Sequence, residues 1–240
     1  MKSLSVLLLL MLALIIFITS VPVQTTLLSW VFPGESRYVH ARRTLVDMAL
    51  EHLLITVVAT ALSSMVGIMA GIAVTRSKGR EFKELVVKLN SFVQTFPPSA
   101  VIILAFPVLG FGLRPALLAL FLYSLFPVLG NTIVGFETVS PAINDAARGM
   151  GMTWFQQLWI AQLPSAFPMI LTGVRHAYIL NLGTAAIAAL IGGGGLGTII
   201  MSGLTLRNSA LVLSGTVVIS LLAFIGEQVF RLISPDERRF

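Results

Sequence analysis

The sequence of 240 residues has no cysteine and only three histidines. Without cysteine the chain forms no disulfide and offers no thiolate ligand to a metal. His40, His52 and His176 are isolated from one another, and no His-Glu-x-x-His pattern is present, so we expect no metal site. A cysteine nucleophile and paired membrane aspartates are missing as well. The sequence therefore shows no catalytic constellation, and we expect the chain not to be an enzyme.

Charged residues are also scarce. They make up 11% of the chain, whereas hydrophobic residues make up 56% and the mean hydropathy is +0.94. Soluble domains carry about 25% charged residues. No charge occurs between Glu51 and Arg76 or between Arg175 and Arg207. Since about 20 apolar residues suffice to cross the hydrocarbon core, the pattern predicts an all-α membrane protein with several spans. The short alternating segments of a membrane β-barrel are absent.

The apolar runs predict a bundle of about six transmembrane helices. The first run follows Lys2 and also has the form of a cleaved signal peptide, so a retained span and a cleaved signal both stay open. We divide the chain into an N-terminal helix with an external linker (1–48) and a core (49–235) that carries a cytoplasmic loop (137–165). The predicted spans cover residues 4–21, 52–75, 91–109, 116–136, 166–191 and 210–233.

The basic residues predict the orientation. Segment 76–88 holds five basic and two acidic residues, and such segments stay in the cytoplasm. By alternation, both termini and the 137–165 loop are also cytoplasmic. The net charge of +6 arises from basic residues at the ends of spans, so we expect no nucleic-acid partner. Three basic residues near the termini agree with this orientation: Lys2, Arg238 and Arg239. Three others disagree, because the orientation places them outside: Arg37, Arg42 and Arg43.

The polar 137–165 loop has the signals of two short helices. Pro141 suits a first helical turn with Ser140 as its N-cap, and Thr153 can cap a second helix. Two glycines, the second of them Gly151, interrupt the pair, and a Leu-Pro dipeptide at 163–164 is expected to end the second helix.

The spacing within this loop resembles the EAA loop of ABC importer permeases. Asp-Ala-Ala is followed after three residues by Gly151, and later by Leu-Pro; Asp145 replaces the usual glutamate, and Ala161 an isoleucine. The resemblance implies the type I importer (MetI-like) permease fold and a loop that docks on a cytoplasmic ATPase. The expected coupling residues are Asp145, Ala146, Ala147, Arg148, Gly151, Leu163 and Pro164.

The wider stretch 148–204 looks like the osmoprotectant branch of these permeases, which transports glycine betaine, choline or carnitine. The likeness covers about residues 52–232. It implies a bacterial inner-membrane location, two ATP-binding subunits that hold ATP and Mg, a second permease subunit (identical or paralogous), a substrate-binding protein and surrounding membrane lipid. No cofactor is expected on this chain. A permease for another small solute such as an amino acid and a free-standing channel are the alternatives.

Polar residues inside the predicted spans have two readings. Tyr178, Asn181 and Thr184 lie three residues apart on one helix, and Asn131 lies in another. They either line a translocation pathway or join helices by hydrogen bonds, and both readings stay open. Arg175 is expected at the cytoplasmic interface.

Three further features are expected to be local. Glu227 and Arg231 form an i, i+4 pair, and His52 is an interfacial side chain. The segment IGGGGLGT lacks the lysine of a phosphate loop and the strand of a dinucleotide fold. Its glycines instead predict a helix break or gate: Gly192, Gly193, Gly194, Gly195 and Gly197.

Overall fold

The computed structural model describes residues 2–76 and 79–234, and the regular secondary structure of this part of the chain is helical, without strands. The all-α prediction is therefore confirmed. Four long helices form the bundle: α3 (Leu45–Thr75), α6 (Leu113–Glu137), α9 (Leu163–Thr184) and α11 (Ser209–Ile233). The shorter elements are α1 (Lys2–Thr19), α2 (Val21–Val31), η1 (Arg80–Phe82), α4 (Lys83–Val93), α5 (Pro98–Leu109), α7 (Pro141–Gly149), α8 (Trp154–Gln156), η2 (Gln157–Gln162), η3 (Ala185–Ile191) and α10 (Gly197–Leu206).

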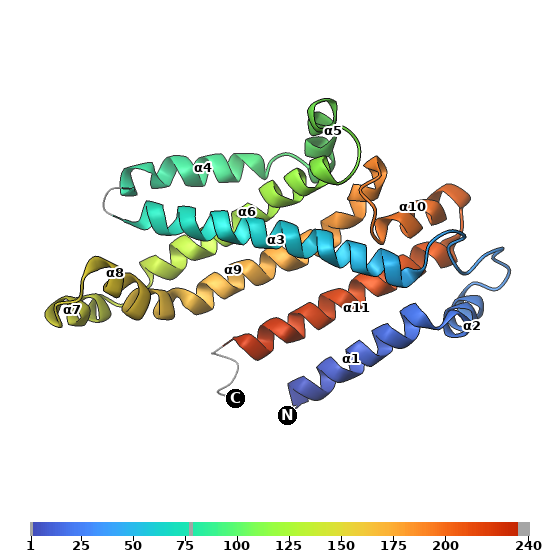
Figure 1. Ribbon diagram of the computed structural model, residues 1–240, viewed down its shortest axis with the longest axis horizontal. Helices are drawn as coiled ribbons and strands as arrows, with labels where there is room; N and C mark the ends of the chain where they lie inside the picture. The colour runs from blue at the N-terminus through green and yellow to red at the C-terminus, as the bar shows by residue number, and fades with distance from the viewer. Residues whose placement is uncertain (1, 77–78, 235–240) are drawn as a thin grey trace.

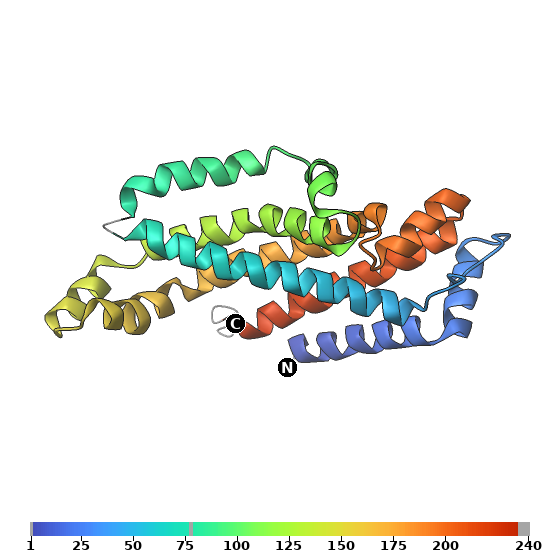
Figure 2. The ribbon, with the colours of Figure 1, turned by 45° about the horizontal axis from the view of Figure 1, so that its top comes forward.

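The helices define two ends of an elongated molecule (Figures 1 and 2). The start of α1 and the end of α11 point toward the end occupied by α7 and α8, whereas α2 and α10 lie at the opposite end. α6 packs between α3 and α9, and α1 packs along α11. Arg238 and Arg239, which supported the predicted orientation, lie outside the described residues.

The number of spans depends on how bent helices are counted. Four helical stretches are long and apolar enough to cross a membrane: Leu45–Thr75, Leu113–Glu137, Trp154–Ile191 and Ser209–Ile233. Two bent pairs raise the number to six. The first joins α1 to α2 at 92°, and the second joins η1 and α4 to α5 at 91°.

The predicted span over 91–109 is not one continuous helix but part of a bent pair. α4 ends at Val93 and α5 begins at Pro98, and Pro97 between them has an extended ψ of 142°. A proline disfavours helical geometry in the residue before it, so the Pro-Pro pair bends the chain. Residues 80–88 of the expected cytoplasmic segment 76–88 are helical, as η1 and the start of α4, and residues 77 and 78 lie outside the described part of the chain. The segment expected to be an external linker also begins as a helix, α2.

The expected helix end at Leu163-Pro164 was wrong. The helix runs on from Trp154 to Ile191, and η2 is a π-helical turn directly before Pro164. The Leu163 N–H bonds to the carbonyl of Leu158, five residues back. Proline lacks an N–H and normally breaks the i to i−4 pattern. The wider π-turn accommodates this missing donor without interrupting the helix.

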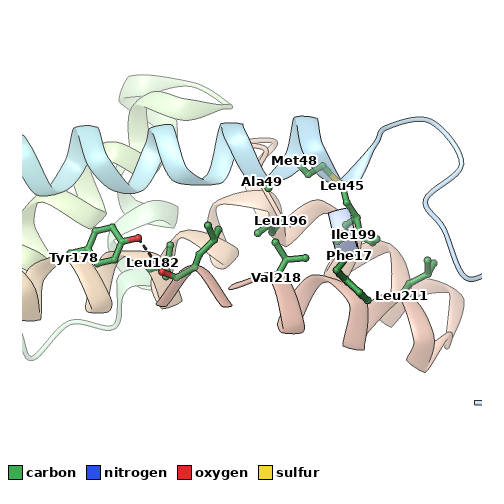
Figure 3. Packing of buried hydrophobic residues seen from close by; sticks show 11 residues of the cluster. Phe17, Leu45, Met48, Ala49, Tyr178, Leu182, Leu196, Ile199, Leu211 and Val218 are labelled. Carbon is green, nitrogen blue, oxygen red and sulfur yellow. Dashed lines mark hydrogen bonds between the residues drawn. The ribbon is translucent and has the colours of Figure 1, made fainter. Parts of the chain in front are cut away.

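The main buried cluster joins the N-terminal helix to the core (Figure 3). The cluster includes Phe17 of α1, Met48 of α3, Leu182 of α9 and Val218 of α11. In water, removing apolar surface from solvent stabilises a fold by roughly 25 cal/mol per Å². Lipid tails are themselves apolar, so in a bilayer the van der Waals packing of these side chains stabilises the helix contacts more than the hydrophobic effect does.

Glycines let α3 and α6 pack closely against each other. A Cβ at Gly71 would lie 2.6 Å from Thr132 Cγ2, and one at Gly67 would lie 2.8 Å from Val128 Cγ1. Small residues at such positions let helix backbones approach in membranes.

Gly71→Ala should therefore lower the thermal stability of the purified protein, because overpacking a tight contact costs about 1–3 kcal/mol. Gly130→Ala is the matched control, since a Cβ at Gly130 of α6 meets nothing within 4 Å. Thermal unfolding in detergent checks this. An unchanged midpoint for Gly71→Ala would contradict the packing argument.

Candidate functional site

A glycine joins the two short helices of the 137–165 loop. Gly151 has a φ of +69°, the left-handed conformation that glycine adopts without a Cβ clash. The N–H of Gly151 bonds to the carbonyl of Arg148, and the N–H of Met152 bonds to that of Ala147. These two bonds form a Schellman motif, which ends α7 and turns the chain. The predicted glycine hinge is thus present at Gly151, and Gly149 is still helical.

The second short helix begins with the predicted cap. The Thr153 hydroxyl accepts from the Gln156 N–H, and the Gln156 side chain accepts from the Thr153 N–H at 2.8 Å. This reciprocal capping box fixes the start of α8. Ser140 is also an N-cap, but its side chain makes no capping bond.

The expected coupling residues differ in exposure. Asp145, Ala146 and Arg148 are exposed on α7, whereas Ala147 is only 1% exposed. Ala147 therefore packs inside the loop and is not available to a partner. Gly151 and Pro164 are exposed, while Leu163 packs against the small cluster around Val139 and Ile170.

The loop also exposes large apolar side chains that the sequence reasoning did not single out. Met150, which follows α7, is 68% exposed. In the second short helix the ring centroids of Phe155 and Trp159 lie 5.8 Å apart. The sequence does carry a signal for them, because the aromatic residues of this segment are spaced as on one face of a helix. The exposed members are Met150, Trp154, Phe155, Trp159 and Ile160.

A polar chain of contacts ties the loop to α3. The Arg76 Nη1 donates to Gln162 Oε1 at 2.6 Å, and Gln162 Nε2 donates to Asn144 Oδ1 at 2.8 Å. Arg76 also lies over the Phe136 ring, 4.9 Å from its centroid. Burial lowers the pKa of the Arg76 guanidinium from its ordinary value. The sequence counted Arg76 only as one charge of a basic segment.

The candidate pathway residues do not share one surface. Asn181 is fully buried and bonds to Thr60 Oγ1 of α3 at 3.0 Å. Tyr178 is buried and donates to the Leu222 carbonyl of α11 (Figure 3). Asn131 bonds to the Pro127 carbonyl of its own helix. These contacts favour the helix-joining reading for Asn181 and Tyr178.

Thr184 lies instead in an open groove with a half-buried ion pair. The groove has a volume of about 650 Å³ and includes Arg175 and Glu227. Arg175 binds Glu227 through both Nε and Nη2, which joins α9 to α11. The expected Glu227–Arg231 pair is present at 3.3 Å. It is not only local, because Arg175 of α9 binds the same carboxylate.

The glycine cluster ends η3 and folds back on α3. Gly192, Gly194 and Gly195 all have positive φ, and Gly195 N–H donates to Glu51 at 2.8 Å. Glu51 also pairs with Arg43, which balances the charge of one of the three basic residues that the sequence analysis placed on the external side. Gly193 lies against Ala188, and Gly197 against Ala186, so closely that neither has room for a Cβ.

The sequence suggested that His52 is an interfacial side chain, whereas the structure shows it fully buried. Its Nε2 lies 2.9 Å from the Leu182 carbonyl, near the point where α9 tightens into η3. Glu51 and His52 thus hold the chain on both sides of the break.

Comparison with known proteins identifies the family. Residues 63–239 match the model described as "binding-protein-dependent transport system inner membrane component". The glycine betaine/carnitine/choline transport system permease protein OpuCB of Bacillus subtilis is 37% identical over 75% of this chain and 82% of its own length. The osmoprotectant import permease protein OsmY of Salmonella typhimurium is 36% identical over 77% of this chain and 80% of its own.

Solved structures share the fold. The MetNI methionine ABC transporter, in an inward-facing conformation, matches with a TM-score of 0.65 and 23% identity over 79% of this chain and 95% of the matched one. An amino acid ABC transporter crystallised with histidines gives a TM-score of 0.62 at 21% identity, over 82% and 94% of the two chains. The chain therefore belongs to the family of inner-membrane components of binding-protein-dependent transport systems, as a non-enzymatic permease subunit with the MetI-type fold.

Proposed function

We propose that this permease imports a small osmoprotectant of the glycine betaine, choline and carnitine class into the cytoplasm by alternating access. The observation that carries the substrate class is the set of relatives at 33–37% identity, whose names specify these solutes or osmoprotectant import. A quaternary ammonium is usually recognised by an aromatic cage. We therefore assign tight selection to a separate substrate-binding protein that delivers the solute.

The energy for transport comes, in this proposal, from ATP hydrolysed on partner subunits, which also hold the Mg. The α7–α8 pair is the docking element. It presents the charged Asp145 and Arg148 beside the apolar Met150 and Phe155, and the Schellman turn fixes the angle between its helices. Apolar anchors surrounded by polar groups are typical of protein interfaces. Two ATPase subunits and a second permease subunit, identical or paralogous, complete the assembly.

The orientation follows from the same assignment. If α7 and α8 meet a cytoplasmic ATPase, then the start of α1 and the end of α11 are cytoplasmic too, because they point toward that end (Figure 1). The break around Gly192–Gly197 then faces outward, where we propose it serves as a gate. The Thr184 groove is the candidate pathway segment, because it is open and carries the charged Arg175–Glu227 pair.

The substrate class predicts uptake. A strain lacking its own osmoprotectant importers, supplied with this chain and its neighbouring subunits, should accumulate labelled glycine betaine, choline or carnitine and grow at high salt. Labelled methionine is the control for the amino-acid alternative. Accumulation of methionine without any of the three osmoprotectants would contradict the proposal.

The docking role predicts a position-specific effect of an added methyl group. Gly151→Ala should lower uptake severalfold, because the left-handed conformation costs a non-glycine residue about 1–2 kcal/mol. Gly149→Ala is the control, since Gly149 is helical and equally free of neighbours within 4 Å. Uptake and the amount of co-purified ATPase are measured together. Equal uptake by the two variants would rule out a required turn.

A further inference from the structure

One polar chain crosses from a membrane span to the docking loop. Arg76 follows the last residue of α3, Gln162 is the last residue of η2, and Asn144 lies in the middle of α7. The two hydrogen bonds of 2.6 Å and 2.8 Å join these three elements in series. Gln162 is the hub, because its oxygen and its nitrogen serve different neighbours.

The Arg76 guanidinium lies over the Phe136 ring but makes fewer hydrogen bonds than it could. Its Nε and Nη2 are buried and have no hydrogen-bond partner among the residues that the structure describes. Arg175 offers a comparison within the same chain, since its Nε and Nη2 both bind the carboxylate of Glu227. Leaving buried N–H groups unpaired is costly, and apolar residues often replace buried charges without loss of stability. The geometry of Arg76 therefore calls for a reason other than fold stability.

The surroundings of Gln162 show what the chain of contacts can do. Gln162 sits in the π-helical turn that absorbs Pro164, and π-turns in helices frequently occur at functional sites. A polar cavity of about 450 Å³ lies beside the contacts and is lined by Arg76, Asn144 and Gln162. The loop is thus not packed solidly against α3 here, and the hydrogen bonds carry the connection across that gap.

We propose that Arg76 and Gln162 are positioning residues that couple α7 to α3 and α9. When a bound ATPase displaces α7, the Asn144–Gln162–Arg76 contacts transmit the displacement to the ends of both spans. This inference rests on the proposed function, and it names the side chains through which the docking loop acts. Loss of the link would leave ATP hydrolysis possible but poorly converted into transport.

The test measures solute imported per ATP hydrolysed by the complete transporter in proteoliposomes, with the substrate-loaded binding protein present. Arg76→Met and Gln162→Met should each lower this ratio by about tenfold, the factor expected for a lost hydrogen bond to a charged group. Asn144→Leu should lower it, whereas Asn144→Asp should restore it, because aspartate keeps the accepting oxygen. Lys83→Met is the control, since the Lys83–Glu137 pair borders the same region and does not involve α7.

The outcomes separate the inference from the proposed function. A purely structural role would lower the thermal midpoint and both rates together while leaving the ratio unchanged, and this would overturn the inference. If the Arg76 and Gln162 variants do not assemble, the Asn144→Leu and Asn144→Asp pair decides. If the wild-type chain shows no ATPase stimulated by the loaded binding protein, the proposed function itself fails.

Discussion

In the hydrocarbon core, a backbone N–H or carbonyl finds no water, so every break in a helix must be repaired by the protein itself. The helices of this chain have several breaks, and the described structure shows a repair at three of them. The π-turn before Pro164 shifts hydrogen bonding to five residues, and His52 and Glu51 take up backbone groups on either side of the glycine break. At the loop, the Schellman bonds around Gly151 satisfy the end of α7.

Two of these repaired breaks, the π-turn and the glycine cluster, lie at the two ends of α9. Gln162 and the π-turn mark the end near α7, and the glycine cluster marks the other end, where α2 and α10 lie (Figure 1). α9 itself is fixed between them by Asn181 and Tyr178, which bond to α3 and α11. A rigid helix with irregular ends is suited to pass a movement from a docking loop to a distant gate. The arrangement fits alternating access, in which bundles move as rigid bodies around irregular segments.

Local signals in the sequence predicted much of this. Hydropathy identified the long spans, and the Pro, Thr and Gly positions predicted both short helices of the loop and its turn. The errors occurred where two signals competed. Pro164 reads as a helix end, yet a π-turn accommodates it, and the apolar run 91–109 reads as one span although Pro97 and Pro98 bend it.

Contacts between distant positions were outside the reach of sequence patterns. Arg76 and Gln162 are 86 residues apart, His52 and Leu182 are 130 apart, and Arg175 and Glu227 are 52 apart. Each residue alone resembled an ordinary interfacial side chain. Only the packing of the helices shows that Arg76 contacts the loop and that Glu227 binds Arg175 as well as Arg231.

The central claim is that the α7–α8 pair faces the cytoplasm and meets an ATPase there. Because the chain has no cysteine, Met150→Cys introduces a single reactive thiol at the exposed tip of the loop. A membrane-impermeant maleimide should label it in inside-out vesicles, not in intact cells, and a bound ATPase should protect it. Labelling from the outside of intact cells would contradict the account.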